Sequence, residues 1–169
     1  SDLCDVPTPP SLESLLVQAR RVVVLEGSND AENIGAVARS ARALGADLLL
    51  LDPTCAAPFG RRSIRVSMGE LLHLPVWQAT EWPTPIDLLH MHGITTWALT
   101  PRHRATSLFE LPAPDRLALV AGAEGPGLSP ATLSRCRHEV RIPMHRGVDS
   151  LNIGHALAIA MATVSPLPA

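Results

Sequence analysis

"RIPMHRGVDSLNIGHALAIAMATV", residues 141–164, is the stretch that decides the fold of this chain. It predicts a short strand that ends at Pro143, a polar loop that contains Gly147, and a helix that opens with Ser150 and Asn152. The helix is apolar almost all round, and a helix of that kind belongs in an interior or an interface. Its N-terminus offers unpaired backbone N–H groups and small hydrogen-bonding side chains, which suit the binding of a ligand.

The composition is that of one folded domain. The chain has 169 residues, of which 46% are hydrophobic, and this favours a globule over a disordered chain. The net charge of −2 gives no bulk signature of nucleic-acid binding, although all 14 basic residues are arginine, whose forked donors suit phosphate. The three cysteines are far apart and no apolar run reaches membrane-spanning length. We therefore expect a cytoplasmic protein without a metal ion and without a membrane partner.

Alternating strand and helix patterns predict an α/β fold with a mostly parallel sheet flanked by helices. Residues 21–25 and 47–51 are continuous apolar strands, and between them a helix with apolar residues at spacings of three and four stops at Gly45. This succession favours a crossover between parallel strands. Five or six strands are expected in all, the others lying near Val76 and at residues 94–99, 117–121 and 140–142.

The remaining segments are assigned more coarsely. Residues 1–20 predict a proline-rich linker followed by a short helix capped by Ser11, and residues 21–169 predict the main domain. Between residues 58 and 77 we expect a short helix broken at Gly69. Further helices are expected at residues 86–91 and after Ser129, and residues 100–115 predict a long loop with one weak apolar turn.

Three polar clusters, residues 29–39, 122–129 and 144–152, follow predicted strands. Because ligands of open α/β sheets bind beyond the carboxyl ends of the strands, we expect the three clusters to converge. Each cluster alone has an ordinary structural explanation as a helix cap, a turn or a solvated helix face, and their joint placement is what indicates a site. The glycine-rich "GAEGPG" lacks both the Gly-x-Gly-x-x-Gly spacing and a Walker lysine, which argues against a nucleotide-dependent oxidoreductase.

In order and spacing, these clusters resemble the three motifs of the SpoU/TrmH-type RNA 2′-O-ribose methyltransferases of the SPOUT superfamily. The motifs are "NDAENIGAVARSARALGAD" (29–47), "LALVAGAEGPGLS" (117–129) and "IPMHRGVDSLNIGHALAIA" (142–160), and "RVSMGELLHLPV" (65–76) resembles the segment that links the first two. The resemblance implies an α/β fold with a deep C-terminal trefoil knot, which the strand pattern alone does not predict because knots are so rare. It also implies S-adenosylmethionine as cofactor and a homodimer to which the C-terminal helix contributes.

The resemblance carries over to individual residues of this sequence. It implies that the catalytic residues are Asn33, Arg39, Glu124, Ser150 and Asn152. It implies that the cofactor-binding residues are Leu99, Thr100, Gly122, Ala123, Glu124, Gly125, Gly127, Ile142, Pro143, Met144, Ser150, Leu151 and Asn152. Arginine keeps its proton at any ordinary pH, so we interpret Arg39 as a clamp on the RNA phosphate that stabilises developing alkoxide, rather than as a base.

The substrate implied is structured RNA, with ribosomal RNA favoured over transfer RNA because two-domain members of the family often act on large-subunit RNA. Two arginine groups, Arg61-Arg62-Arg65 and Arg102-Arg104, offer phosphate contacts. The proline-rich start suggests a junction to an N-terminal RNA-binding domain. The alternatives are a transfer RNA methyltransferase and a protein that binds cofactor and RNA without turnover.

Overall fold

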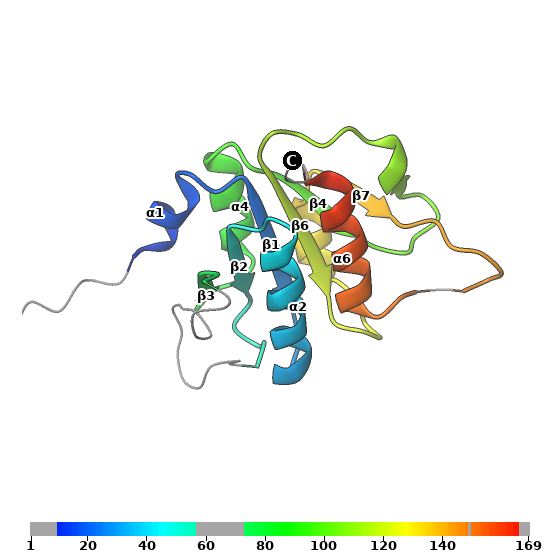
Figure 1. Ribbon diagram of the computed structural model, residues 1–169, viewed down its shortest axis with the longest axis horizontal. Helices are drawn as coiled ribbons and strands as arrows, with labels where there is room; N and C mark the ends of the chain where they lie inside the picture. The colour runs from blue at the N-terminus through cyan, green and yellow to red at the C-terminus, as the bar shows by residue number, and fades with distance from the viewer. Residues whose placement is uncertain (1–9, 57–72, 149, 166–169) are drawn as a thin grey trace, which may run out of the picture.

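The protein is described from a computed structural model, which covers residues 10–56, 73–148 and 150–165 (Figure 1). The predicted helix around Gly69, the arginines Arg61, Arg62 and Arg65, and the predicted linker before residue 10 lie outside these ranges.

A single sheet forms the centre of the described chain, with strands in the order β3-β2-β1-β6-β4-β7-β5. The seven strands are β1 (Arg21–Glu26), β2 (Leu48–Leu51), β3 (Val76–Gln78), β4 (Thr95–Leu99), β5 (Thr106–Ser107), β6 (Leu117–Gly122) and β7 (His138–Arg141). Every pairing between these strands is parallel, so all of their carboxyl ends meet at one edge. The predicted mostly parallel α/β sheet is therefore confirmed.

Helices cover both faces of the sheet (Figure 1). They are α1 (Leu12–Leu16), α2 (Ala31–Ala43), α4 (Thr84–Met91), the 3₁₀ turn η2 (Leu108–Glu110), α5 (Pro130–Arg135) and α6 (Ile153–Val164). One hydrophobic cluster joins α2, α6 and η2 to one face, and a second joins α1, α4 and α5 to the other.

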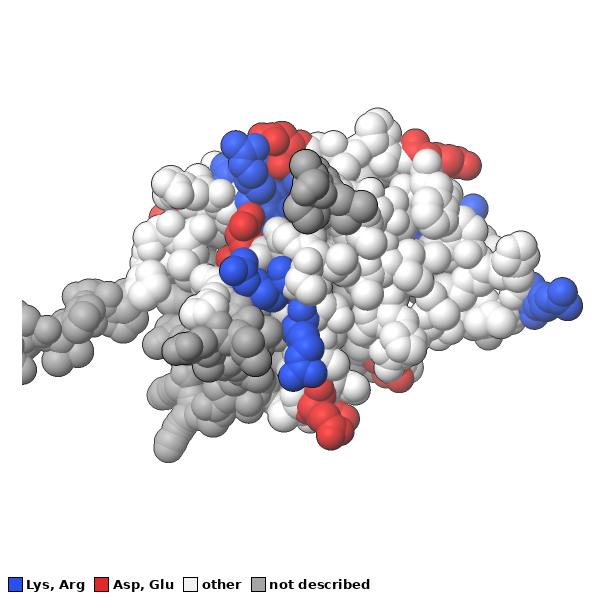
Figure 2. All heavy atoms as spheres, in the orientation of Figure 1, with Lys and Arg blue, Asp and Glu red and all other residues white. Residues whose placement is uncertain are grey.

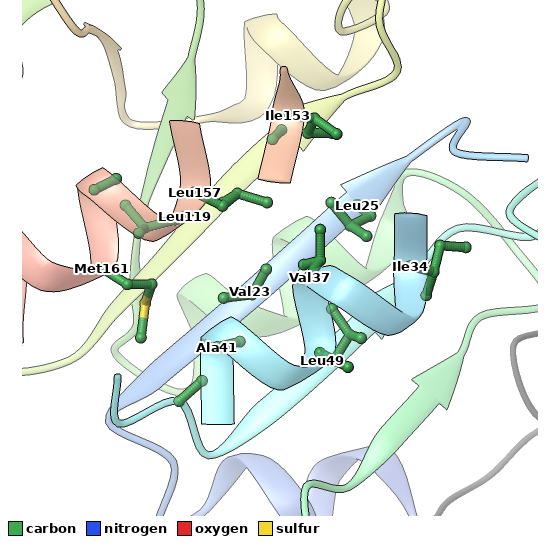
Figure 3. Packing of buried hydrophobic residues seen from close by; sticks show 14 of the residues in the cluster. Val23, Leu25, Ile34, Val37, Ala41, Leu49, Leu119, Ile153, Leu157 and Met161 are labelled. Atoms are coloured by element: carbon green, nitrogen blue, oxygen red, sulfur yellow. The ribbon is translucent and has the colours of Figure 1, made fainter. Parts of the chain in front are cut away.

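The core follows from the two-residue period of buried strands. Val23 and Leu25 of β1 point toward α2 and α6, whereas Val22 and Val24 belong to the opposite cluster. In Figure 3 the β1 residues meet Val37 of α2, and side chains of β6 and α6 close the same layer. Leu25 is fully buried, and burial of a leucine of that kind contributes about 1.5–3 kcal/mol to stability.

Helix α6 is fixed at both ends. At its start, the Asn152 side chain accepts hydrogen bonds from Gly154 N at 2.8 Å and His155 N at 3.3 Å, so Asn152 is the N-cap and Ser150 is not. At its end, the buried Arg21 donates from its guanidinium to the Val164 carbonyl at 2.8 Å. Burial lowers the pKa of Arg21, and the guanidinium remains charged beside the negative end of the helix.

Several predicted boundaries change in the structure. Strand β7 begins at His138 and ends at Arg141, so the predicted strand 140–142 is displaced, and α4 begins at Thr84 inside a predicted loop. The predicted long loop contains β5 as well as the expected turn η2, which raises the strand number above the expected five or six. A two-residue strand is too short for any sequence period to reveal.

Candidate functional site

A pocket of about 290 Å³ opens at the carboxyl edge of the sheet, beyond β4, β6 and β7. Its volume lies near 300 Å³, roughly the lower end for pockets that hold small molecules. Its wall is formed by Leu99, Thr100, Pro101, Ala121, Gly122, Ala123, Glu124, Gly125, Gly127, Val140, Ile142, Met144, Ser150, Leu151, Ile153 and Ala156. The second and third predicted clusters therefore meet here, and β4 contributes its end.

The loop at residues 122–127 forms the tightest part of the wall. A Cβ added to Gly122 would lie 2.3 Å from the Gly127 carbonyl carbon, so no larger residue fits there without moving the backbone. Gly127 N donates to the Ala123 carbonyl at 3.0 Å, and Gly127 takes φ +70°, a left-handed conformation that favours glycine. The loop thus presents main-chain atoms, rather than side chains, to a ligand.

A carboxylate connects the two clusters. Glu124 Oε1 accepts a hydrogen bond from Asn152 Nδ2 at 2.7 Å and a longer one from Ile153 N at 3.4 Å. The carboxylate lies at the N-terminus of α6, where the helix dipole stabilises negative charge. Glu124 and Asn152 are both exposed, so the pair can exchange these contacts for contacts with a bound molecule.

Apolar side chains form the rest of the wall. Leu99 ends β4, Ile142 and Leu151 lie in the connection between β7 and α6, and Ile153 begins α6. The strand ends that carry two of them are held together, since Thr100 N donates to the Val140 carbonyl at 2.9 Å. An apolar wall beside exposed main-chain groups suits a flat aromatic ligand such as a nucleobase.

Most of the predicted cofactor residues lie on this wall. Pro143 and Asn152 do not, although Asn152 binds Glu124 from outside it. Sequence reasoning missed Pro101, Ala121, Val140, Ile153 and Ala156. The strand ends Ala121 and Val140 follow from the rule that ligands bind beyond carboxyl ends, but nothing in the sequence marks Ala156.

The first cluster does not converge with the other two as expected. Asn33 is half-buried and Arg39 is exposed, and neither lines the pocket. Helix α2 begins at Ala31 and runs away from the carboxyl edge, which carries Arg39 roughly 12 Å along its axis at 1.5 Å per residue. Basic side chains run along the outer face of α2 in Figure 2, separate from the uncharged surface over α6.

The two described cysteines are not nucleophiles. Burial raises the pKa of the Cys55 thiol to about 12, and burial also raises the pKa of the Cys136 thiol to about 11. Both thiols are therefore protonated at neutral pH, and neither lines the pocket.

Within the described ranges, no three side chains of the metal-binding types gather closely enough to hold an ion. In the same ranges, no helix has the length and apolarity needed to cross a membrane.

The sequence of the chain is similar to those of known RNA methyltransferases. It is 45% identical over 154 residues to an uncharacterized tRNA/rRNA methyltransferase of Mycobacterium tuberculosis, covering 89% of this chain and 54% of that protein. It is 29% identical to the 23S rRNA (guanosine(2553)-2′-O)-methyltransferase RlmP of Bacillus subtilis, over 93% of this chain and 60% of RlmP. The chain thus spans a little over half the length of these curated relatives.

Solved structures agree with the sequence relatives. The SpoU methyltransferase AviRb of Streptomyces viridochromogenes, in complex with the cofactor AdoMet, superposes with a TM-score of 0.77 at 25% identity, over 92% of this chain and 64% of AviRb. Residues 20–162 match the SpoU rRNA methylase family. The chain belongs to that family.

Proposed function

We propose that this chain is the catalytic domain of an S-adenosylmethionine-dependent methyltransferase that modifies a ribose 2′-hydroxyl of structured RNA. The observation that carries the proposal is the pocket itself, in which two motifs of a SpoU family chain meet through the Glu124–Asn152 contact. The AdoMet complex of AviRb and the 2′-O activity in the name of RlmP support it.

The residues of the pocket fit this cofactor. The apolar wall of Leu99, Ile142 and Leu151 suits adenine, and the main-chain groups near Met144 and Leu151 suit the polar edge of the base. Gly122 lets the chain pass where a Cβ would collide with the loop, which keeps the space open. When bound there, S-adenosylmethionine supplies a methyl group already activated on a sulfonium.

The protein groups then have to position the acceptor oxygen and stabilise its charge. We assign Glu124 and Asn152 to orienting the ribose, with Ser150 on the same rim and Asn33 in support of Arg39. Arg39 would hold the neighbouring phosphate and stabilise negative charge that develops on the 2′-oxygen.

The role of Arg39 bears on assembly. Because Arg39 lies off the pocket wall of its own chain, we propose a homodimer in which the second copy brings its Arg39 to the pocket. The surface of α6 supports such an interface, since the helix carries no Asp, Glu, Lys or Arg, as the uncharged surface in Figure 2 shows. The helix also exposes Ile159. We also propose the C-terminal knot, and the three loops that surround one pocket support it.

A basic rim offers a path for RNA. Arg102 and Arg104 both bind Glu139, at 3.1 Å and 3.4 Å, directly after the pocket residues Thr100 and Pro101. Two arginines that share one carboxylate leave a net positive charge, which suits a phosphate. We propose that this rim contacts the RNA backbone and that residues 1–20 connect to a further RNA-binding domain.

The substrate proposed is ribosomal RNA of the cytoplasm, with the named activity of RlmP as support. Isothermal titration calorimetry with S-adenosylmethionine, followed by transfer of tritiated methyl to isolated ribosomal and transfer RNA, tests the proposal. Heat of binding together with label in ribosomal RNA is expected. Binding without label in either RNA would leave a non-catalytic protein, and label confined to transfer RNA would overturn the substrate.

A further inference from the structure

Glu26, the last residue of β1, is a buried carboxylate with only 7% of its surface exposed. Oε1 accepts a hydrogen bond from Ser129 N at 2.7 Å. Oε2 accepts hydrogen bonds from Ser129 Oγ at 2.9 Å, from Trp82 Nε1 at 2.7 Å and from Thr132 Oγ1. These donors are far from Glu26 in sequence: Trp82 lies just before α4, and Ser129 and Thr132 lie at the start of α5.

The main chain of the same residue holds the pocket loop from its other end. The Glu26 carbonyl accepts a hydrogen bond from Ala123 N at 2.9 Å, and Glu26 is paired in register with Gly122. Ala123 opens the loop of the pocket wall, and Ser129 closes it as the N-cap of α5. One buried residue therefore fixes both ends of the segment between residues 123 and 129.

We propose that Glu26 is the positioning residue of the pocket loop, and that it acts on cofactor binding without touching the cofactor. The inference rests on the proposed function for the identity of the ligand. Glu26 is not on the pocket wall, so it is not a catalytic residue. The Glu26 carboxylate accepts all four of these hydrogen bonds, and it has no donor of its own. A glutamine would instead turn an NH₂ group, which is a donor, toward some of the same donor groups.

The fold supplies a matched control in Asp52, which follows β2. Asp52 is 4% exposed, and its carboxylate accepts hydrogen bonds from Gly27 N, Thr54 N, Thr54 Oγ1 and Cys55 N. It is as buried and as fully bonded as Glu26, and none of its side-chain partners lies between residues 122 and 132. Replacing each carboxylate by its amide neutralises a buried, hydrogen-bonded side chain, but only the Glu26 carboxylate bonds directly to Ser129 at the end of the pocket loop.

The test compares Glu26→Gln, Glu26→Asp and Asp52→Asn with the wild-type chain. S-adenosylmethionine affinity is measured by calorimetry, and hydrogen exchange of the amides at residues 123–128 is measured without ligand. If the loop adopts its binding conformation for only about a tenth of the time in Glu26→Gln, the apparent Kd for S-adenosylmethionine rises about tenfold. The loop amides are also expected to exchange faster than in the wild type. Glu26→Asp is expected to recover part of both losses, and it decides the question if Glu26→Gln does not fold.

The control separates positioning from general stability. Asp52→Asn is expected to lower the melting temperature while it leaves the Kd and the exchange of the loop amides near wild type. Equal changes in Kd for the two amide variants at equal loss of stability would overturn the proposal, as would unchanged loop exchange in both Glu26 variants. If the wild-type chain binds no S-adenosylmethionine, the proposed function fails, and the exchange measurement still judges the role of Glu26.

Discussion

At the scale of single residues, the pocket depends on positions where the backbone leaves no room. Gly122 is the sharpest case, because a Cβ there would lie 2.3 Å from the Gly127 carbonyl carbon and 2.5 Å from Leu128 N. Both neighbours are main-chain atoms, which cannot move aside by changing a rotamer.

Gly122→Ala is therefore expected to displace the loop and to abolish cofactor binding, with a loss of about 1–3 kcal/mol in unfolding free energy from overpacking. Gly35→Ala is the stability control, since a Cβ there meets nothing within 4 Å in the middle of α2, and it is expected to stabilise by up to about 1 kcal/mol. Urea unfolding and calorimetry measure both quantities. Wild-type affinity in Gly122→Ala would show that the loop does not form the pocket.

The residues named by sequence motifs were the predictable part of the site. Glu124 and Asn152 are short-range features of their motifs, and the structure joins them at 2.7 Å. Glu26 was not predictable, because it lies just beyond the predicted strand 21–25 and its donors lie 56 to 106 residues away in sequence. A buried carboxylate is explained only by its partners, and a single sequence does not show them.

At the scale of elements, the connection between β4 and β5 carries the proposed RNA contact. Arg102→Gln combined with Arg104→Gln is expected to weaken RNA binding and to lower the salt dependence of log K by about 1.5–2, while the Kd for S-adenosylmethionine stays unchanged. Arg20→Gln is the matched control, because Arg20 is an exposed arginine paired with Asp115 at 2.7 Å at the opposite edge of the sheet. Filter binding at several salt concentrations measures the slope. Equal slopes of log K against log salt for the double variant and Arg20→Gln would show that this connection does not contact the RNA.

Helix α4 is predicted to make stability depend on pH. Burial, followed by the nearby charge of Arg137, lowers the pKa of His90 below 6.5, and His90 Nε2 lies 2.7 Å from Thr96 Oγ1. The unfolded chain then binds more protons than the folded chain just below pH 6.5, so stability falls as the pH falls through this window.

Between about pH 7.5 and about pH 5.5, the unfolding free energy of His90→Gln is expected to fall by less than that of the wild type. Urea unfolding at the two pH values measures both decreases. His103→Gln, at an exposed histidine, is expected to follow the wild type. A wild-type pH dependence that His90→Gln retains in full would exclude His90 as its source.

The strands were predictable because continuous apolar runs such as residues 48–51 are buried on both faces of the sheet. Their order was not predictable. The positions of β6 between β1 and β4, and of β7 beside β4, depend on pairings between distant segments that leave no mark in the local pattern.

At the scale of the whole molecule, the proposed dimer makes each pocket depend on both chains. Arg39→Lys is expected to lose most of its turnover in single-turnover assays and to keep its affinity for S-adenosylmethionine, because Arg39 lies off the pocket wall. Arg42→Lys, one turn along the same exposed face of α2, is the control and is expected to retain the wild-type rate.

Mixed dimers test whether Arg39 acts across the interface. Arg39→Lys and Glu124→Gln are each expected to be inactive alone. When the two are unfolded and refolded together, half of the dimers are mixed and carry one intact pocket each, so activity recovers to about a quarter of wild type under two-fold symmetry. Native mass spectrometry verifies the mixed dimer. Mixed dimers with no recovery would show that Arg39 acts within its own chain or not at all.

The central claim is that this pocket directs a methyl group to a ribose 2′-oxygen, and alkaline hydrolysis of the labelled product tests it most directly. Ribosomal RNA treated with the protein and S-adenosylmethionine labelled with tritium in its methyl group is hydrolysed completely in alkali and separated by size. A methylated 2′-oxygen cannot attack the adjacent phosphate, so the account predicts label in alkali-resistant dinucleotides, and the Glu124→Gln variant should give none. Label in mononucleotides, which marks a methylated base, would contradict the account.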